Sequence, residues 1–441
     1  MTSAPQSATL KQIGAAEPTS FARAVFTLVV LSLIGGLNNV DRNMFGLILP
    51  QIKADIHLSD FVLGFLSGPA FVIIYSTAGV PLAWLADKTS RRNIIAFGLG
   101  FWSLVTMATG LATNVVHLLF SRAFLGVGEA SNMAPSSAMI GDLFPKKTRA
   151  VAVAVFAAGG PLGVMMAFPL IGWMTEHHGW RTAFYVMGAF GVSLAVFALV
   201  FLREPPREAT AEQTTDGNSL SFRSAVATAA RSKPFLLLIV GATMLSINYS
   251  AMIVWVPTFM ARVHDLNAQE TGAYLGLYRG LFGVIAALCG GLIVTLLSRL
   301  DGRALAWVPA GFYVVMCPAE LLLLFSDGSV GWQIGLALDN LFMNATIPCT
   351  FALLLALVDP KMRAVGSSFY LLIFNLVGQI VGPLAVGGLN EVLQPVFGET
   401  AIRYSLLISP ISMVIGAAIL LMLAKYFKED RQGGQSPSSI Q

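Results

Sequence analysis

Charged residues are scarce in this sequence. Only 50 of its 441 residues, or 11%, are Asp, Glu, Lys or Arg, whereas a soluble domain carries about 25%. This deficit excludes a soluble enzyme, a disordered chain and a coiled coil. Hydrophobic residues make up 56% of the chain, which is enough for about twelve membrane-spanning helices of ~20 residues each. The net charge of +4 is too small to indicate a nucleic-acid partner.

Catalytic and metal-binding motifs are also absent. The sequence has no H-E-x-x-H, no G-x-S-x-G and no phosphate-binding loop with a lysine, so neither a membrane enzyme nor an ATP-driven pump is favoured. The adjacent His177 and His178 do not have the spacing of metal ligands on a helix. We therefore expect no cofactor. Three cysteines lie in apolar runs and are expected to be small buried residues without a disulfide: Cys289, Cys317 and Cys349.

Twelve apolar stretches of spanning length predict an all-α membrane protein. They cover residues 22–50, 60–86, 93–112, 115–140, 149–174, 182–202, 234–260, 271–298, 304–325, 331–358, 364–390 and 402–427. The first is too long for the core of a signal peptide and is expected to be retained. The expected domains are a tail at 1–21, a six-helix bundle at 22–202, a polar linker at 203–233, a second six-helix bundle at 234–427 and a tail at 428–441. A short amphipathic helix is one interpretation of residues 220–231 in the linker.

The positions of the basic residues predict the orientation in the membrane. If the N-terminus is cytoplasmic, 20 of the 27 Lys and Arg residues lie on the inner side, four lie outside and three lie within spans. Cytoplasmic loops of membrane proteins carry such an excess of positive charge. We therefore expect both termini in the cytoplasm and a multi-pass protein of the cell inner membrane or plasma membrane.

The fifth span of each predicted bundle begins in a similar way. Residues 149–154 read Arg-Ala-Val-Ala-Val-Ala, residues 363–368 read Arg-Ala-Val-Gly-Ser-Ser, and each run follows a short polar loop with a proline. Two repeated six-helix halves, with a substrate site between them near the midplane, are typical of secondary transporters. A basic cap at any cytoplasmic membrane boundary would look alike, so the repeat alone leaves both interpretations open.

Four motifs in the first half are similar to those of the major facilitator superfamily. The loop at residues 83–92 resembles its G-x-x-x-D-R/K-x-G-R-R/K signature, with alanine and serine in place of two glycines. Residues 122–130 resemble its R-x-x-x-G-x-G-x-A motif, residues 159–163 its Gly-Pro motif and residues 179–184 its outer loop. The resemblance covers the whole chain and implies the major facilitator fold, with twelve transmembrane helices in two six-helix halves.

Within that superfamily, three segments look like the spinster group. They read Asn-Val-Asp-Arg at residues 39–42, Gly-Glu-Ala at 128–130 and Gly-Asp-Leu-Phe-Pro at 141–145. This resemblance implies export of lysolipids and sphingoid phosphates by proton-coupled alternating access. An organic-anion symporter or a drug/proton antiporter of the same superfamily is the nearest alternative. A channel is less favoured, because no charge ring or filter sequence is present.

The expected partners follow from this interpretation. They are an amphipathic or anionic small molecule or lipid, protons and the lipid bilayer. The protein is expected to be a monomer that binds no nucleic acid.

Seven ionisable side chains lie within the predicted spans, and each costs at least ~2.5 kcal/mol at a helix centre unless it has a partner or a wet cavity. They are Asp41, Arg42, Arg122, Glu129, Arg279, Glu320 and Asp339. At ~1.5 Å per residue, Asp41 and Arg122 lie at similar depths, so we expect them to pair. Arg42 would reach toward Glu129 or the substrate. Glu129 is the expected proton-coupling acid, with Asp41 as its neighbour in the network; a permanent salt bridge that holds the outer gate shut is the alternative.

A second group of charges lies at the predicted cytoplasmic boundary. Asp87 and Arg91 belong to the signature loop, and Asp142 and Arg149 flank the next cytoplasmic loop. The family resemblance implies a gating latch, in which Arg149 could pair with Asp142 or Asp87. Simple anchoring of positive charge on the inner side is the alternative, above all for Arg91.

The second half offers fewer candidate residues. Arg279 is its only basic residue deep in a span, so it is expected either to bind an anionic head group or to pair with Asp339. Glu320 lies nearer a span end and could extend to the surface. Four further residues are candidates for lining a substrate cavity, although polar amides in spans also join helices: Tyr249, Trp255, Asn344 and Asn375.

Overall fold

Every element in the described part of the chain is a helix. The computed structural model describes residues 20–205, 232–358 and 362–427. The first half contains α1 (Phe21–Ile56), α2 (Asp60–Ser67), α3 (Pro69–Lys88), α4 (Arg91–Thr109), α5 (Val115–Glu129), α6 (Met133–Leu143), α7 (Lys146–His178) and α8 (Trp180–Phe201). The second half contains α10 (Lys233–Val263), α11 (Ala268–Ser298), α12 (Ala304–Phe325), α13 (Ser329–Leu357), α14 (Arg363–Phe397), η2 (Gly398–Thr400), α15 (Ala401–Ser405) and α16 (Ile408–Ala424). The linker helix predicted at residues 220–231 lies outside the described residues.

Nine helical segments within the described residues are long and apolar enough to span a membrane. The last of them, Val365–Ala424, contains α14 and α16 and turns at Gly398, whose φ is +57°. Glycine adopts this left-handed conformation at little cost, so the chain can reverse there. The shorter α4, α5 and α6 are not among the nine.

The first helix is longer than the sequence predicts. It begins after Ser20, whose side chain accepts a hydrogen bond from the Arg23 amide, and continues through Pro50 to Ile56. The prediction that it ends at residue 50 is wrong, because proline is tolerated inside membrane helices where neighbouring groups satisfy the freed carbonyl. The extra turns place residues 41 and 42 about 21–23 Å from the helix end at ~1.5 Å per residue.

Three of the predicted continuous spans are broken, and the stretch predicted at 402–427 consists of α15 and α16. The stretch predicted at 60–86 consists of α2 and α3, which meet at Gly68, and the stretch predicted at 115–140 consists of α5 and α6. A Cβ atom at Gly68 would lie 2.0 Å from the Gln379 carbonyl oxygen on α14, so only glycine allows this close approach. Pro69 then starts α3, where its missing N–H costs nothing. The break in the helix thus accompanies tight packing between the two halves.

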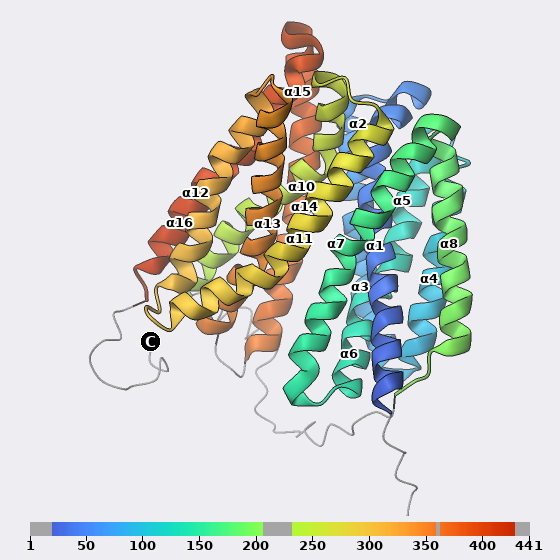
Figure 1. Ribbon diagram of the computed structural model, residues 1–441, viewed down its shortest axis with the longest axis vertical. Coiled ribbons are helices and arrows are strands. Elements are labelled where there is room, and N and C mark those ends of the chain that lie inside the picture. Colours follow the sequence, from blue (N-terminus) through green and yellow to red (C-terminus); the bar gives the residue numbers. More distant parts are fainter. Residues whose placement is uncertain (1–19, 206–231, 359–361, 428–441) are drawn as a thin grey trace, which may run out of the picture.

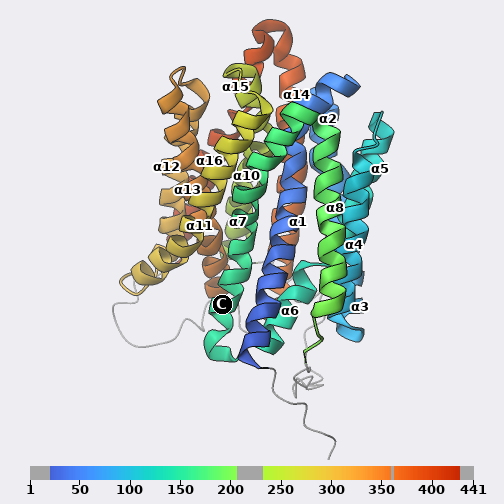
Figure 2. The same cartoon turned by 45° about the vertical axis from the view of Figure 1, so that its right-hand side comes forward.

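The helices form two bundles that touch at one end. In Figures 1 and 2, the blue-to-green bundle and the yellow-to-red bundle meet near α2 and α15, here called the upper end, and diverge toward α6, the lower end. Near the upper end α7 and α11 pack backbone to backbone: a Cβ atom at Gly172 would lie 2.4 Å from the Ala268 oxygen, and one at Gly272 would lie 2.5 Å from the Phe168 oxygen. Lower down, α7 packs instead on α1, where Gly159 approaches the Ser32 oxygen equally closely.

The cysteines differ in environment. Cys349 is buried as predicted, Cys317 is partly buried, and Cys289 is exposed on α11, which contradicts the prediction of burial for that residue. An apolar run shows that a helix is in the membrane but not which of its faces points outward to lipid. All three thiols are free.

Candidate functional site

An ion pair buried in the first bundle joins α1 to α5. The Arg42 guanidinium donates from Nε and Nη2 to Glu129 Oε2, at 3.2 and 3.1 Å. Glu129 is fully buried, and its Oε1 has no hydrogen-bond partner. The Arg42 side chain is 26% exposed and lies over the ring of Tyr75, 4.6 Å from its centroid. The predicted contact between Arg42 and Glu129 is therefore present, with one carboxylate oxygen free and the cation accessible.

The predicted pair between Asp41 and Arg122 is wrong. Asp41 Oδ2 accepts a hydrogen bond from the indole nitrogen of Trp102 on α4, at 3.1 Å. Arg122 instead donates to the Leu66 carbonyl oxygen at 3.2 Å and lies 4.1 Å from the centroid of the Phe45 ring. The sequence estimate compared depths only, and it measured them from an incorrect end of α1. Nothing in the sequence singled out Trp102 as the partner.

A pocket lies between the two bundles, next to this network. It has an empty volume of about 480 Å³. The residues that line it from α1 and α7 are Asn39, Asn43, Pro161 and Val164, and those from the second bundle are Tyr249, Ile253, Arg279, Asn340, Met343 and Asn344. Both bundles therefore contribute amide side chains and apolar surface to one pocket.

The pocket contains three of the residues predicted for it. Arg279 donates from Nη2 to the Met252 and Ile253 carbonyl oxygens, at 3.1 and 3.2 Å, and its buried Nη1 has no partner. It forms no ion pair with Asp339 among the described residues, although the two charges interact at longer range. Tyr249 and Asn344 also line the pocket, as predicted.

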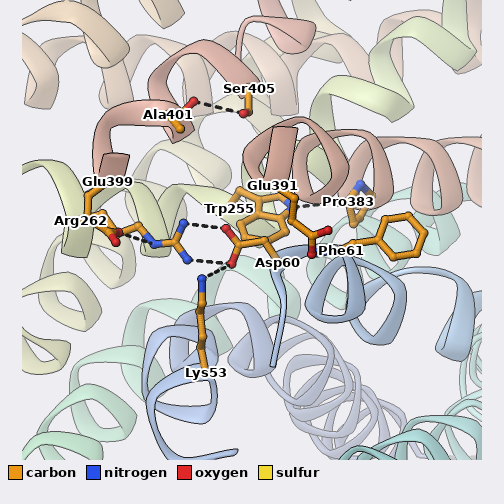
Figure 3. Close-up of polar contacts among 10 residues, drawn as sticks. All are labelled: Lys53, Asp60, Phe61, Trp255, Arg262, Pro383, Glu391, Glu399, Ala401 and Ser405. Carbon is orange, nitrogen blue, oxygen red and sulfur yellow. Dashed lines mark hydrogen bonds and ion pairs between the residues drawn. The ribbon is translucent and has the colours of Figure 1, made fainter. Parts of the chain in front are cut away.

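Two cavity candidates lie elsewhere. Trp255 is fully buried and donates from its indole nitrogen to the Pro383 carbonyl oxygen at 3.0 Å, near the upper end (Figure 3). Asn375 donates to Leu371 within its own helix. Asn43 is a pocket residue that sequence reasoning missed. Its signal was present, because asparagines four residues apart share one helix face, and Asn39 and Asn43 repeat the spacing of the pair on α13.

A second ionic cluster, which the sequence did not suggest, joins the bundles at the upper end (Figure 3). The buried Asp60 on α2 accepts hydrogen bonds from Lys53 at 2.7 Å and from both terminal nitrogens of Arg262 on α10, at 2.7 and 2.8 Å. Beside it, the Phe61 amide donates to Glu391 of α14 at 2.9 Å. Lys53 and Arg262 are two of the four basic residues assigned to the outer side. Because basic residues are rare on the outer side, these two could have been identified from the sequence as candidates for an ion pair.

The charges at the lower end lie within the first bundle. Arg91 forms an ion pair with Asp142 and a longer one with Asp87, at 3.8 Å. Arg149 does not pair with either acid, which corrects the prediction; it donates to the Gly141 and Phe144 carbonyl oxygens at the end of α6. Those carbonyls have no partner within the helix, so a nearby guanidinium satisfies them. The cluster holds α3, α4, α6 and α7 together.

Comparisons with known proteins agree with the fold. Residues 31–383 match the Major Facilitator Superfamily. The chain belongs to this superfamily. It is 30% identical over 408 residues to an MFS-type efflux pump of Mycolicibacterium smegmatis, covering 91% of this chain and 92% of that protein.

This transporter is also similar to spinster proteins. It is 26% identical over 433 residues to the sphingosine-1-phosphate transporter of Danio rerio, covering 91% of this chain and 84% of that protein. The crystal structure of a bacterial homologue of the human lysosomal transporter spinster, inward-facing and unoccupied, superposes with a TM-score of 0.82 at 24% identity, over 92% of this chain and 98% of that one. The spinster resemblance is confirmed, and the protein is a multi-pass membrane transporter rather than an enzyme.

In this transporter the charge network and the pocket are adjacent. The hydroxyl group of Tyr249 lies within electrostatic range of both Arg42 and Arg279. Asn39 and Asn43, on the same helix as Arg42, line the pocket directly. A charged group that enters the pocket can therefore act on both guanidinium groups.

Proposed function

We propose that this protein is a proton-coupled secondary transporter that works by alternating access and moves amphipathic, lipid-like substrates such as lysolipids or sphingoid phosphates. The observation that carries the proposal is the buried Glu129 carboxylate, which has one free oxygen and one oxygen bonded to the accessible Arg42 guanidinium. A proton on Glu129 weakens that bond and releases Arg42 toward the pocket. Proton binding and the binding of an anionic head group are thereby linked.

The packing supports an inward-facing state with twelve spans. Counting Val365–Ala424 as two spans, and adding α4 and the broken helix α5–α6, gives twelve from the nine apolar segments. The excess of basic residues on the lower side supports a cytoplasmic position for that side. The upper end, closed by Asp60 and by the contact between α7 and α11, then faces outward. We propose that the protein acts as a monomer, because the pocket is formed within one chain.

The pocket supports an amphipathic anion. It offers the unpartnered Nη1 of Arg279 and several amides beside apolar side chains such as Val164, Ile253 and Met343. A cation can recognise a phosphate head group, and apolar contacts can hold part of a chain. The similarity to a sphingosine-1-phosphate transporter supports the same class.

A drug/proton antiporter is the second candidate, and the similarity to an efflux pump favours it. An organic-anion symporter would use the same cations. Three probes separate these functions in liposomes that contain the purified protein: sphingosine-1-phosphate, the cationic dye ethidium and a short-chain alkyl phosphate. Transport of sphingosine-1-phosphate alone supports the proposal, and preference for either other probe would replace it.

Glu129→Gln tests the coupling. We expect a pH gradient to drive sphingosine-1-phosphate accumulation in the wild type. In the variant this accumulation should be about tenfold lower, which is within the usual range of coupling between two ligands. Counterflow without a gradient should persist. The matched control is Glu270→Gln at the start of α11, where glutamine preserves the capping box. Undiminished gradient-driven accumulation in Glu129→Gln would contradict the role of Glu129.

A further inference from the structure

Two acidic side chains face each other deep in the second bundle. Glu320 on α12 and Asp339 on α13 are 0% and 1% exposed, and their carboxyl groups lie within hydrogen-bonding range of each other. Burial of Glu320 contradicts the expectation that it extends to the membrane surface. No sequence pattern connects the two acids, because they lie on different helices.

The surroundings of the pair are polar but short of donors. Asn248 on α10 donates from its amide nitrogen to Glu320 Oε1 and also to the Ser409 hydroxyl on α16, at 2.6 Å. Three buried oxygens around the pair have no hydrogen-bond partner: Glu320 Oε2, Asp339 Oδ1 and Asn248 Oδ1. Ionised carboxylates and amide oxygens only accept hydrogen bonds. The cluster therefore lacks a hydrogen atom to join its acceptors.

The nearby charges cannot balance two carboxylates. The titratable groups that face the pair in the described residues are Arg279 on α11 and Cys317 on α12, with Tyr249 on α10 next to Arg279. From α16 the pair meets the neutral Ser409. Arg279 is a single cation, and it forms no direct ion pair with Asp339 among the described residues. Two like charges in contact and away from water do not both stay ionised.

We propose that Glu320 and Asp339 share one proton and form a second proton-binding site, distinct from Glu129. One carboxyl group donates this proton to the other, which accepts it as a carboxylate, so the pair carries one negative charge. Asn248 and Ser409 fix the position of Glu320. Asp339 senses the charge of Arg279, which lines the substrate pocket.

The position next to Arg279 links the site to the pocket. An anionic head group beside Arg279 offsets the positive charge that Asp339 senses. The shared proton is then held more firmly while the pocket is occupied and less firmly when it is empty. This use in transport rests on the proposed function, whereas the existence of the shared proton does not.

Infrared spectroscopy of the purified full-length protein tests the existence of the site, because protonated carboxyl groups and carboxylates absorb at different frequencies. We expect Glu320→Gln and Asp339→Asn each to remove one protonated-carboxyl band at neutral pH, and the double variant to remove no more than either single variant. Glu270→Gln is the control and should leave the spectrum unchanged. The proposal of a shared proton would be overturned if neither single variant changed the spectrum. It would also be overturned if the double variant lost two bands.

Transport measurements test its use. With sphingosine-1-phosphate as the probe, the reversal potential gives the number of protons moved per substrate, and we expect one fewer in Glu320→Gln than in the wild type. An unchanged number would overturn the coupling role of the pair. If the wild type shows no proton dependence while the infrared band is present, the proposed function fails and the proton site stands. Both variants should unfold at the same temperature as the wild type, which would exclude misfolding as the cause of any change in proton number.

Discussion

The two bundles differ in the ratio of acidic to basic side chains that they bury. Deep in its described spans the first bundle has two acids and two bases, and Arg42 and Glu129 are in direct contact; the buried Asp60 lies at the upper end. The second has one base, Arg279, and two acids, Glu320 and Asp339, that contact each other instead. A neutral set is stable without a proton, whereas a set with excess negative charge in an apolar interior is stable only with one. Similar folds can thus make opposite demands on protons.

The largest expected effect breaks the balance of the first bundle. Arg42→Ala leaves Glu129 without its cation, and a buried charge that loses its partner costs about 3–5 kcal/mol. We expect the double variant Arg42→Ala with Glu129→Gln to recover most of this loss in thermal unfolding. Arg181→Ala is the control, because its partner Asp55 is 42% exposed, and such pairs contribute about 0–1 kcal/mol. Equal losses in the two arginine variants would show that burial of the first pair is irrelevant.

Asp60 tests whether the bundles are electrically separate, because it belongs to one bundle and bonds to Arg262 of the other. Asp60→Asn removes the carboxylate that Lys53 and Arg262 share, and among the described residues Arg262 then keeps only its ion pair with Glu399 at 3.3 Å. We expect the closed upper end to lose on the order of 3 kcal/mol of its preference, about a hundredfold in population. Spin labels at Ala54→Cys and Gln269→Cys, with the three native cysteines replaced, should then report longer distances.

The control for Asp60 is Asp55→Asn, since Asp55 pairs with Arg181 inside one bundle at 2.7 Å. It should leave the distance distribution unchanged. A distribution that Asp60→Asn does not lengthen would mean that the other contacts between the bundles, such as those of α7 with α11 and of α2 with α14, hold the upper end closed without the Asp60 carboxylate.

A smaller effect is expected in the second bundle. Asp339→Asn replaces an acid with an amide that can donate to Glu320 in place of the shared proton. We therefore expect its unfolding free energy to change by less than about 1 kcal/mol, the typical net value of one hydrogen bond. A loss as large as that of Arg42→Ala would remove the difference between the bundles.

The smallest effect concerns His264, outside the spans of the second bundle. Burial, and then the positive charge of Arg403, lower the pKa of His264 from its usual value of 6.5, and its Nε2 has no partner. Protonation is thus easier in the unfolded chain, so this contribution to stability is present above pH 6.5 and is lost as the pH falls. We expect His264→Gln to reduce the acid sensitivity of thermal unfolding slightly. A steeper loss in the variant would contradict this sign.

The membrane class and the family followed from the sequence, because both depend on local composition and short motifs. The boundaries of α1 and the breaks at Gly68 and after Glu129 did not. These depend on contacts such as that between Gly68 and the Gln379 oxygen, more than 300 residues apart. Hydropathy reports the preference of each residue for lipid. A helix break inside an apolar run hardly changes the hydropathy profile, so the profile does not predict the break.

The candidate site divides in the same way. The sequence identified the rare charges, since a charged side chain in an apolar span stands out and needs a partner. It named Glu129 as one of two possible partners of Arg42, and that contact is present. It paired Asp41 with Arg122, whereas the partner of Asp41 is Trp102. Depth along a helix can be counted from sequence, whereas the direction of a side chain around the helix depends on neighbours.

The sequence by itself thus determined that this chain is a membrane transporter of the Major Facilitator Superfamily and which charges it buries. The tertiary structure decided which charges meet: it brings Arg42 to Glu129 and Glu320 to Asp339, and it adds the pair of Asp60 with Arg262, which the sequence did not suggest. The physical reason is range. Hydrophobicity acts through each residue's own surface, whereas a hydrogen bond or ion pair between distant parts of a chain exists only once packing has brought two atoms within about 3 Å.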